Sequence, residues 1–211
     1  MLQLPPPFAE IVLREGGDAF RRAVAEAQAG AGAGLLVWVR RLGSVDCAVI
    51  LEPDEPLATA RHVLLSGLTA VADALAAISP PEKPLALVWP DRVTFDGGLV
   101  GGGRLAWPAG CAEAARPDWL VFGFALRTLG EASQSAPSAA LIDDGFEDFE
   151  TGPFLESFAR HLMLALDDWA KAGPAAARAG WRRYGTAPAH APDLRILQAA
   201  PSWLDGGEIA A

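Results

Sequence analysis

The chain has 211 residues, of which 51% are hydrophobic and 20% charged, so it can bury the core of one ordinary domain and is not disordered in bulk. Its formal net charge is −9 at pH 7. Nucleic-acid phosphates and anionic membranes are bound by clustered lysine and arginine side chains. The charge therefore argues against both nucleic acid and a membrane surface as the main partner.

Targeting and metal-binding signals are sparse. The N-terminal residues lack a basic region followed by a long apolar core, so we expect no signal peptide. No apolar run reaches the roughly 20 residues that a membrane span needs. Cys47 and Cys111 show no metal-ligand spacing and fit a reduced protein. We expect a soluble, cytoplasmic protein without a metal site.

The first quarter of the chain predicts a strand, a helix and a hairpin. Residues 8–13 are typical of an edge strand. Asp18 can cap a helix that runs to about Ala29, because its carboxylate accepts hydrogen bonds from the first helical N–H groups. Two β-rich runs, 35–40 and 45–51, are joined by a four-residue link, which predicts an antiparallel hairpin.

Apolar periodicity organises most of the later chain. Residues 57–78 carry apolar side chains at three- and four-residue steps, which predicts one long helix. Residues 119–127 predict a buried strand, and the polar, acidic stretch 130–152 favours a solvated loop. A helix with an apolar stripe over 155–169 and a shorter helix ending near Tyr184 follow.

The stretch 85–107 is the centre of the sequence. Its first five residues form a short apolar run that predicts a buried strand, which Pro90 ends because proline has no N–H to donate. Residues 93–95 are β-rich, 96–98 are turn residues, and apolar residues resume directly afterwards. This pattern predicts a hairpin.

Three glycines, Gly101, Gly102 and Gly103, lie inside the returning strand of this hairpin. Glycine within a strand costs roughly 0.5–1 kcal/mol relative to alanine. Two explanations remain open: a ligand or another segment lies close against the bare backbone, or the strand contains a bulge. On the first explanation, we expect Gly102→Val to block a ligand slot and leave the protein folded, since β-branched residues suit strands.

The predicted order is strand, helix, two strands, long helix, three strands, two helices. It indicates class α+β, with a mixed, largely antiparallel sheet and helices packed on one face. Residues 1–184 form the expected domain. Residues 185–211 are expected to be a tail too short for its own core, with Trp203 and Leu204 as its anchors.

The central segment resembles a signature of biotin protein ligases and the related lipoate ligases. That signature is Trp-Pro-Asn-Asp, a hairpin, then Lys-Leu-Ala-Gly; here WPD stands at 89–91 and LVG at 99–101. The tryptophan and proline match, the aspartate stands for the asparagine, and Arg92 stands for the family aspartate. The resemblance covers roughly residues 8–184, and it implies the biotin/lipoate ligase catalytic-domain fold without an added DNA-binding domain or full C-terminal barrel.

The chain departs from the family at its charged positions. Val88 and Gly98 stand where the family has lysine. Only the short segment 40–43 represents the glycine-arginine-rich loop that precedes the family's long helix. These departures indicate degenerate active-site motifs.

Two further family segments match in part. Residues 16–18, Gly-Gly-Asp, replace the family's Ser-Thr-Asn. In the later strand Gly123 keeps the first glycine of Gly-x-Gly-Ile-Asn, whereas Arg127 takes the place of the asparagine. The fold match is therefore more specific than the active-site match.

The candidate ligand-binding residues form a glycine slot with an aromatic wall and several cations. Bare glycine backbone could supply hydrogen bonds to a flat, largely apolar ligand. Arginines, with Arg104 as a further candidate, could bind a carboxylate or phosphate in bidentate geometry, although each alone is also explained as a surface residue that aids solubility. No catalytic residue is assigned. The predicted ligand-binding set is Trp89, Asp91, Arg92, Gly101, Gly102, Gly103, Gly123, Arg40, Arg41 and Arg127.

Three functions are compatible with these residues. The first is a ligase-like protein that binds a small acyl group or acyl-adenylate with weak or altered chemistry. The second is an active ligase that uses ATP with Mg to activate biotin or lipoate and acylates a lysine of a biotinyl or lipoyl carrier domain, as the resemblance implies. The third is a non-catalytic scaffold that forms a homodimer through its exposed sheet.

Overall fold

The structure is a computed structural model, and it describes residues 1–130, 139–186 and 203. Its seven-stranded sheet has the order β1-β2-β3-β7-β6-β5-β4. The β1–β2 pair is parallel and every other neighbouring pair is antiparallel. The strands are β1 (Ala9–Leu13), β2 (Leu35–Val39), β3 (Ser44–Leu51), β4 (Leu85–Val88), β5 (Arg92–Phe95), β6 (Gly98–Ala106) and β7 (Leu120–Arg127).

Five helices among the described residues complete the fold: α1 (Ala19–Gln28), α2 (Leu57–Ala60), α3 (Val63–Ala76), α4 (Thr151–Ala172) and α5 (Pro174–Trp181). The predicted α+β class with a mixed, largely antiparallel sheet is confirmed. Four strands, rather than the predicted three, separate α3 from α4, because both arms of the central hairpin and the run before it each form a strand.

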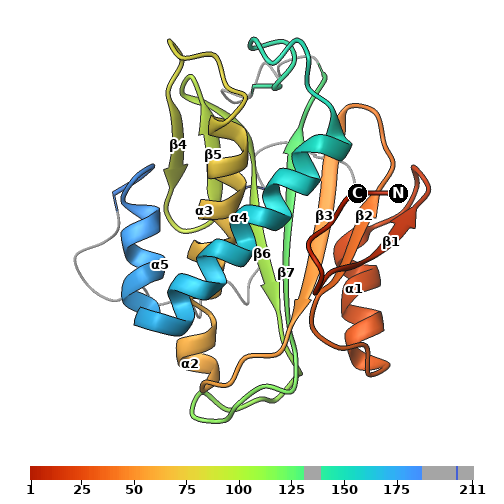
Figure 1. Ribbon diagram of the computed structural model, residues 1–211, viewed down its shortest axis with the longest axis vertical. Helices are drawn as coiled ribbons and strands as arrows, with labels where there is room; N and C mark the ends of the chain where they lie inside the picture. Colours follow the sequence, from red (N-terminus) through yellow and green to blue (C-terminus); the bar gives the residue numbers. More distant parts are fainter. Residues whose placement is uncertain (131–138, 187–202, 204–211) are drawn as a thin grey trace.

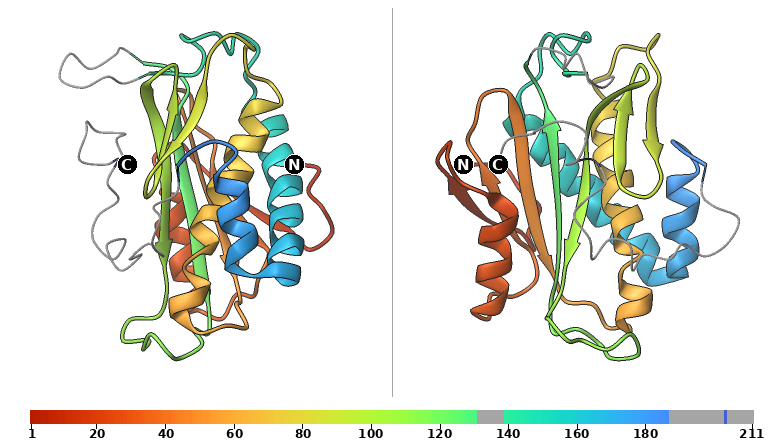
Figure 2. Two further views of the ribbon diagram at one scale, coloured as in Figure 1. Left: turned by 90° about the vertical axis from the view of Figure 1, so that its left-hand side faces the viewer. Right: turned by 180° about the vertical axis from the view of Figure 1, so that it is seen from behind.

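The helices divide between the two faces of the sheet. Helices α3, α4 and α5 cover one face (Figure 1), whereas α1 packs on the opposite face beside β2 and β3 (Figure 2, right). The expectation of helices on one face therefore holds for all but α1. A parallel pair needs a crossover, and α1 is the crossover between β1 and β2. Side chains along β2 alternate between the two faces: Trp38 faces the α4 side and Val37 faces the α1 side.

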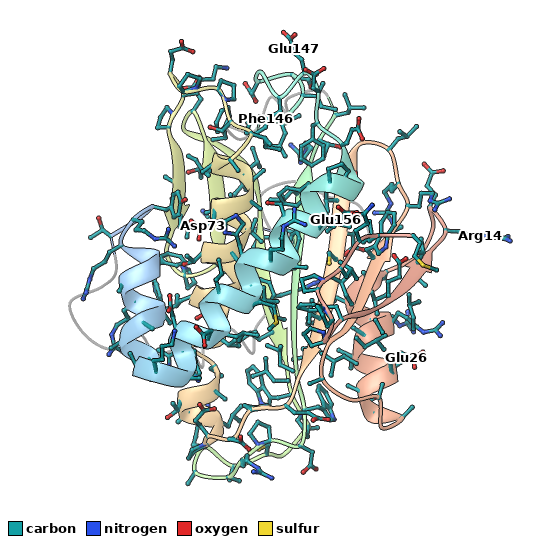
Figure 3. All side chains as sticks on the ribbon, in the orientation of Figure 1. Arg14, Glu26, Asp73, Phe146, Glu147 and Glu156 are labelled. Atoms are coloured by element: carbon teal, nitrogen blue, oxygen red, sulfur yellow. The ribbon has the colours of Figure 1, made fainter. Side chains whose placement is uncertain are left out.

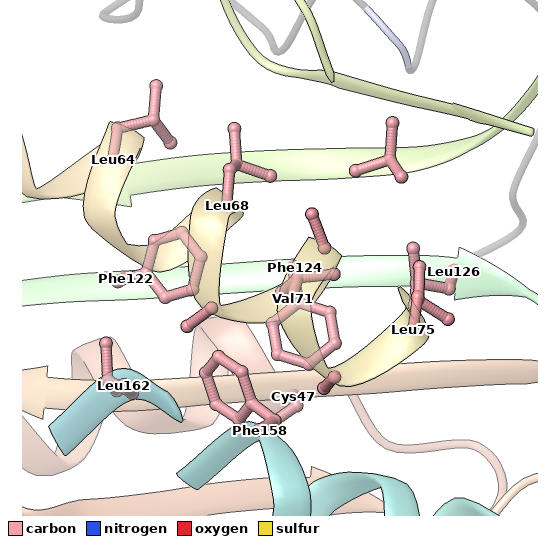
Figure 4. Packing of buried hydrophobic residues seen from close by; sticks show 14 of the residues in the cluster. Cys47, Leu64, Leu68, Val71, Leu75, Phe122, Phe124, Leu126, Phe158 and Leu162 are labelled. Carbon is pink, nitrogen blue, oxygen red and sulfur yellow. The ribbon is translucent and has the colours of Figure 1, made fainter. Parts of the chain in front are cut away.

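Aromatic side chains fill the core beneath α3 and α4 (Figure 4). Phe124 meets Phe158 of α4 edge-to-face, with ring centroids 4.7 Å apart. Gly67 lets α3 approach β7, because a Cβ there would lie 2.5 Å from the Phe122 ring. The apolar stripe predicted over 57–78 is buried in this core.

The long helix predicted over 57–78 is interrupted. The described helix α2 ends at Ala60, and α3 starts at Val63. Arg61, at the joint, is 2% exposed, pairs with Glu113 and lies 5.2 Å from the centre of the Trp107 ring. A buried arginine needs a carboxylate partner, and here that partner is Glu113, far away in sequence. The periodicity of apolar residues therefore could not predict the break at Arg61.

Candidate functional site

The glycine-rich part of β6 belongs to the half of the sheet that α1 does not cover. Arg92 of β5, Gly102 of β6 and Ala125 of β7 are paired in register, so their side chains share one face. Arg104 and Arg127 belong to the same face by strand alternation. We call the face made by these five residues, on the α1 side of the sheet, the slot face. Seen from behind, β4, β5 and β6 have no helix in front of them (Figure 2, right).

Gly102 is in contact with an aromatic ring from the C-terminal end of the chain. A Cβ at Gly102 would overlap both the carbonyl oxygen of Asp91 and the indole of Trp203. Trp203 is 1% exposed, and its Nε1 donates a hydrogen bond of 2.9 Å to the carbonyl oxygen of Gly103. Its predicted role as an anchor is confirmed in that it is buried; Leu204 lies outside the described residues.

Each glycine of the triplet is required by a different neighbour. Gly101 lies where the β5–β6 register shifts, and a Cβ there would overlap the Ala125 carbonyl oxygen. Gly102 accommodates the indole, and Gly103 faces α3, where a Cβ would lie 3.1 Å from Leu64 and Leu68. Both sequence explanations, a bulge and a close approach, therefore apply. The expectation that Gly102→Val leaves the fold intact is wrong, because the Asp91 backbone cannot move away without breaking the sheet.

Gly123 of β7 makes room for a second ring. A Cβ at Gly123 would lie 2.5 Å from Phe20 of α1, and Arg104 lies opposite Gly123 in register. The Arg104 guanidinium is 4.2 Å from the centre of the Phe20 ring, a cation–π contact. Rings therefore occupy two of the predicted glycine positions, Phe20 at Gly123 and Trp203 at Gly102.

Acidic groups surround Arg104. Its Nη2 lies 3.5 Å from Asp18 and 3.9 Å from Asp46. Asp46 also accepts a hydrogen bond of 3.1 Å from the backbone N–H of Ala19, at the start of α1. Burial raises the pKa of Asp46, against the lowering effect of that hydrogen bond and of Arg104. Asp46 was not predicted as a site residue, although an aspartate inside the apolar run 45–51 was the available signal.

Three buried polar atoms of this region have no hydrogen-bond partner within the described part of the chain. They are Oδ1 of Asp46, Nε of Arg104 and Nη1 of Arg127, contributed by β3, β6 and β7. Buried polar groups in folded proteins are nearly always paired, so unpaired ones mark a place for a ligand, an ion or water. Two of these atoms are cationic donors and one is an anionic acceptor.

The other predicted residues lie in different places. Arg41 donates from Nε to the Glu15 carbonyl (2.9 Å) and from Nη2 to the Gly17 carbonyl (2.8 Å), which fixes the loop before α1. Arg40 is exposed and lies over Trp38, on the opposite face from the slot.

Trp89 and Asp91 of the WPD segment make structural contacts within the fold. Trp89 packs edge-to-face on Trp181 of α5, with centroids 5.7 Å apart, in the core on the α3 side. Asp91 is fully buried, and its carbonyl accepts the N–H of Gly103 at 2.8 Å. The structure therefore groups Arg92, Gly102 and Arg127 on one face, with the Asp91 carbonyl beside Gly102, and separates Gly103, Trp89 and Arg40 from them.

The two family lysine positions also differ in space. Val88, at the end of β4, is 43% exposed. Gly98 is packed against the segment after β7, since a Cβ there would lie 2.6 Å from the Cβ of Ala139. A side chain at Gly98 would therefore require the Ala139 segment to shift, so Gly98 is not an open position that has merely lost its lysine.

A separate hollow of about 670 Å³ lies among α3, α4 and α5. Asp73 of α3 lies on the α5 side of this helix layer (Figure 3), where it accepts hydrogen bonds from Tyr184 (2.7 Å) and Arg183 (2.8 Å). Burial, followed by the Asp73 contact, raises the pKa of Tyr184 to about 12. This hollow is on the helical face and shares no residue with the slot face.

Comparison with known proteins places the fold. The model of the biotin/lipoate A/B protein ligase family matches residues 4–183. The chain therefore belongs to this family. No curated protein sequence matches it.

Solved structures share the fold. A biotin protein ligase-like protein of unknown function from Silicibacter sp. TM1040 is 28% identical, with a TM-score of 0.81, covering 88% of this chain and 81% of that one. Biotin protein ligase from Aquifex aeolicus is 19% identical, with a TM-score of 0.66 and coverage of 84% and 78%. The Leishmania major enzyme with biotinyl-5-AMP is 15% identical, with a TM-score of 0.62 and coverage of 90% and 86%. None of the described helices of the present chain has the length and hydropathy to span a membrane.

Proposed function

We propose that this protein binds a small carboxylic acyl group, or its acyl-adenylate, on the slot face, and that its ligase chemistry is weak or altered. The family and fold supply the ligand class. The Aquifex ligase was solved in complex with biotin and ATP, and the Leishmania ligase in complex with biotinyl-5-AMP. Biotin, lipoate and octanoate are the probes that follow from this class.

The observation that carries the proposal is the pair of unpartnered guanidinium nitrogens, Nε of Arg104 and Nη1 of Arg127. A buried cationic donor without a partner loses much of its solvation, and a carboxylate or phosphate would restore it through charge-assisted hydrogen bonds. Asp46 Oδ1 beside them would accept an N–H or O–H of the same ligand. The site therefore suits a ligand with an anionic group close to a hydrogen-bond donor.

The weak-chemistry part of the proposal rests on Gly98. Adenylation brings a carboxylate against the α-phosphorus of ATP, and fixed positive charge at the developing negative charge is usually the largest catalytic contribution. Gly98 supplies no charge, and Ala139 fills the adjacent space. The arginines of the slot face carry charge, but a planar guanidinium does not replace a lysine point charge at another position.

Arg127→Gln tests the binding site. Removing a charge-assisted contact costs about 1.5–3 kcal/mol, so the affinity for whichever of biotin, lipoate, octanoate, ATP or an acyl-adenylate binds wild type should fall by roughly 10- to 100-fold. Thermal shift followed by isothermal titration measures it. Arg40→Gln is the matched control, since Arg40 is exposed on the other face. Equal affinity in the two variants, or no binding of any probe to wild type, would contradict the proposal.

A further inference from the structure

The ligand slot predicted from the glycine triplet already holds a side chain of the same protein. Trp203 lies 100 residues along the chain from Gly103, to which it is hydrogen-bonded. Its Cδ1 and Cγ lie directly against Gly102, and its Nε1 reaches the Gly103 carbonyl, so the pyrrole edge of the indole follows the β6 backbone. The ring is 1% exposed.

The geometry of the sheet explains why this carbonyl accepts a side-chain donor. Strand β5 begins at Arg92, which pairs with Gly102, so Gly103 is one residue beyond the last β5–β6 pair. The Gly103 N–H still reaches the Asp91 carbonyl at 2.8 Å. The Gly103 carbonyl lies at the end of this ladder, where it accepts the Nε1–H of Trp203.

We propose that Trp203 is an intramolecular competitor for the ligand of this slot, so that an acyl ligand carrying a flat ring binds only when the indole leaves Gly102. The inference rests on the proposed function, because it assumes that an acyl ligand uses the slot face. An indole and an acyl ligand with a flat, N–H-bearing ring, such as the ureido ring of biotin, would use the same bare backbone at Gly102 and the same acceptor at Gly103. The indole and such a ligand cannot occupy the slot together, because the indole lies so close to Gly102 that even a Cβ would not fit there.

The competition raises the apparent Kd by a factor equal to the reciprocal of the fraction of molecules in which the slot is free. If the indole fills the slot in about 90–99% of molecules, removing it should lower the apparent Kd by roughly 10- to 100-fold. The ligand affected should be biotin, whose ureido ring is flat and carries N–H groups. Lipoate, whose dithiolane ring has no N–H, and octanoate, which has no ring, should respond less.

The test compares full-length wild type with Trp203→Ala, Trp203→Phe and the control Trp107→Phe. Trp107 is half-buried under Arg61, so its substitution removes an indole without touching Gly102. Biotin should bind Trp203→Ala most tightly, Trp203→Phe to an intermediate degree because the ring remains without its N–H, and Trp107→Phe like wild type. Free indole should bind Trp203→Ala alone, because only there is the slot vacated.

The outcomes separate the two proposals. Biotin binding wild type and Trp203→Ala equally would overturn the competition and leave the proposed function standing. Indole binding to Trp203→Ala, with no acyl probe binding any variant, would overturn both the proposed function and the competition. If Trp203→Ala does not fold, Trp203→Phe and the indole N–H resonance of Trp203 in wild type serve instead. That resonance should move to a solvent-exposed position on saturation with ligand, and an unchanged resonance would overturn the competition.

Discussion

At the scale of single residues, Asp46, which lies beside Arg104 of the slot face, is the most informative side chain. It sits in β3 among buried apolar neighbours, and it is 7% exposed. Helix α1 presents the Ala19 N–H to it, and Arg104 lies 3.9 Å away, beyond hydrogen-bond distance. Buried ionisable groups with shifted pKa values cluster at functional sites.

Asp46→Asn should change how stability depends on pH. The pKa of Asp46 in the folded protein lies above its ordinary value of 3.8, chiefly because of burial. The proton is therefore held more tightly in the folded state, and the resulting stability is complete below about pH 3.8 and is lost as pH rises through the folded-state pKa. Asparagine keeps an acceptor for Ala19 and never ionises, so it avoids this loss.

The expected result is that the free energy of unfolding of Asp46→Asn, relative to wild type, rises as pH increases from the acidic range toward neutrality. Urea unfolding at a series of pH values measures it. Asp54→Asn is the control, because the Asp54 side chain is 93% exposed. A difference between Asp46→Asn and wild type that stays flat with pH would show that burial does not dominate at Asp46.

At the scale of elements, α2 and its joint with α3 connect the helical layer to the loop that follows β6. The first N–H groups of α2 are bound by the carbonyls of Ala115 and Glu113, at 2.8 and 3.0 Å. Arg61 then pairs with the Glu113 side chain from inside the protein. Backbone and side chain of one loop thus fix the break in the helix.

Glu113→Gln should destabilise the protein. The substitution leaves the buried Arg61 charge without its carboxylate, and breaking a buried pair from one side costs about 3–5 kcal/mol when both partners are buried. The Glu113 side chain is 51% exposed, so a loss of roughly 1–3 kcal/mol is expected here. Chemical unfolding measures it, with Glu147→Gln at an exposed position as the control. A loss no larger than that of Glu147→Gln would show that solvent replaces the carboxylate.

Elements that follow from local patterns were predictable. The cap at Asp18 is confirmed by its 2.8 Å hydrogen bond with the Arg21 N–H, and the β2–β3 and β5–β6 hairpins are confirmed. The predicted buried strand 85–89 is instead the edge strand β4, because an apolar run does not say which neighbours a strand has. The break at Arg61 depends on a residue far away in sequence.

The candidate site was predictable only in part, for the same reason. The glycine triplet predicted a close approach to the strand that contains it, and such an approach is found at Gly102 of β6. What approaches Gly102 is Trp203, and no local pattern links these two residues. Trp89 could not be assigned to a face from sequence, since the ring that packs on it, Trp181, belongs to α5.

At the scale of the whole molecule, the catalytic question can be decided in one assay. With biotin or lipoate, ATP and magnesium, we expect pyrophosphate release slower than about 0.1 per second, because loss of one group that stabilises developing charge typically costs on the order of 10²- to 10³-fold in rate. An ordinary biotin ligase serves as the positive control. Gly98→Lys is expected not to restore the rate, since Ala139 occupies the space. Release at about 0.1 per second or faster would show that another cation has taken over and that the protein is an active ligase.

The segment after α5 has a consequence for self-association. Leu87 of β4 donates its outward N–H to the Tyr184 carbonyl at 3.0 Å, and Gly185 lies so close to the Leu87 carbonyl that a Cβ would overlap it. Unpaired strand edges are the usual template on which a second chain adds a strand, and here that template is already used on the β4 side. A homodimer built by continuing the sheet would therefore have to start from β1, at the opposite edge and far from the slot face.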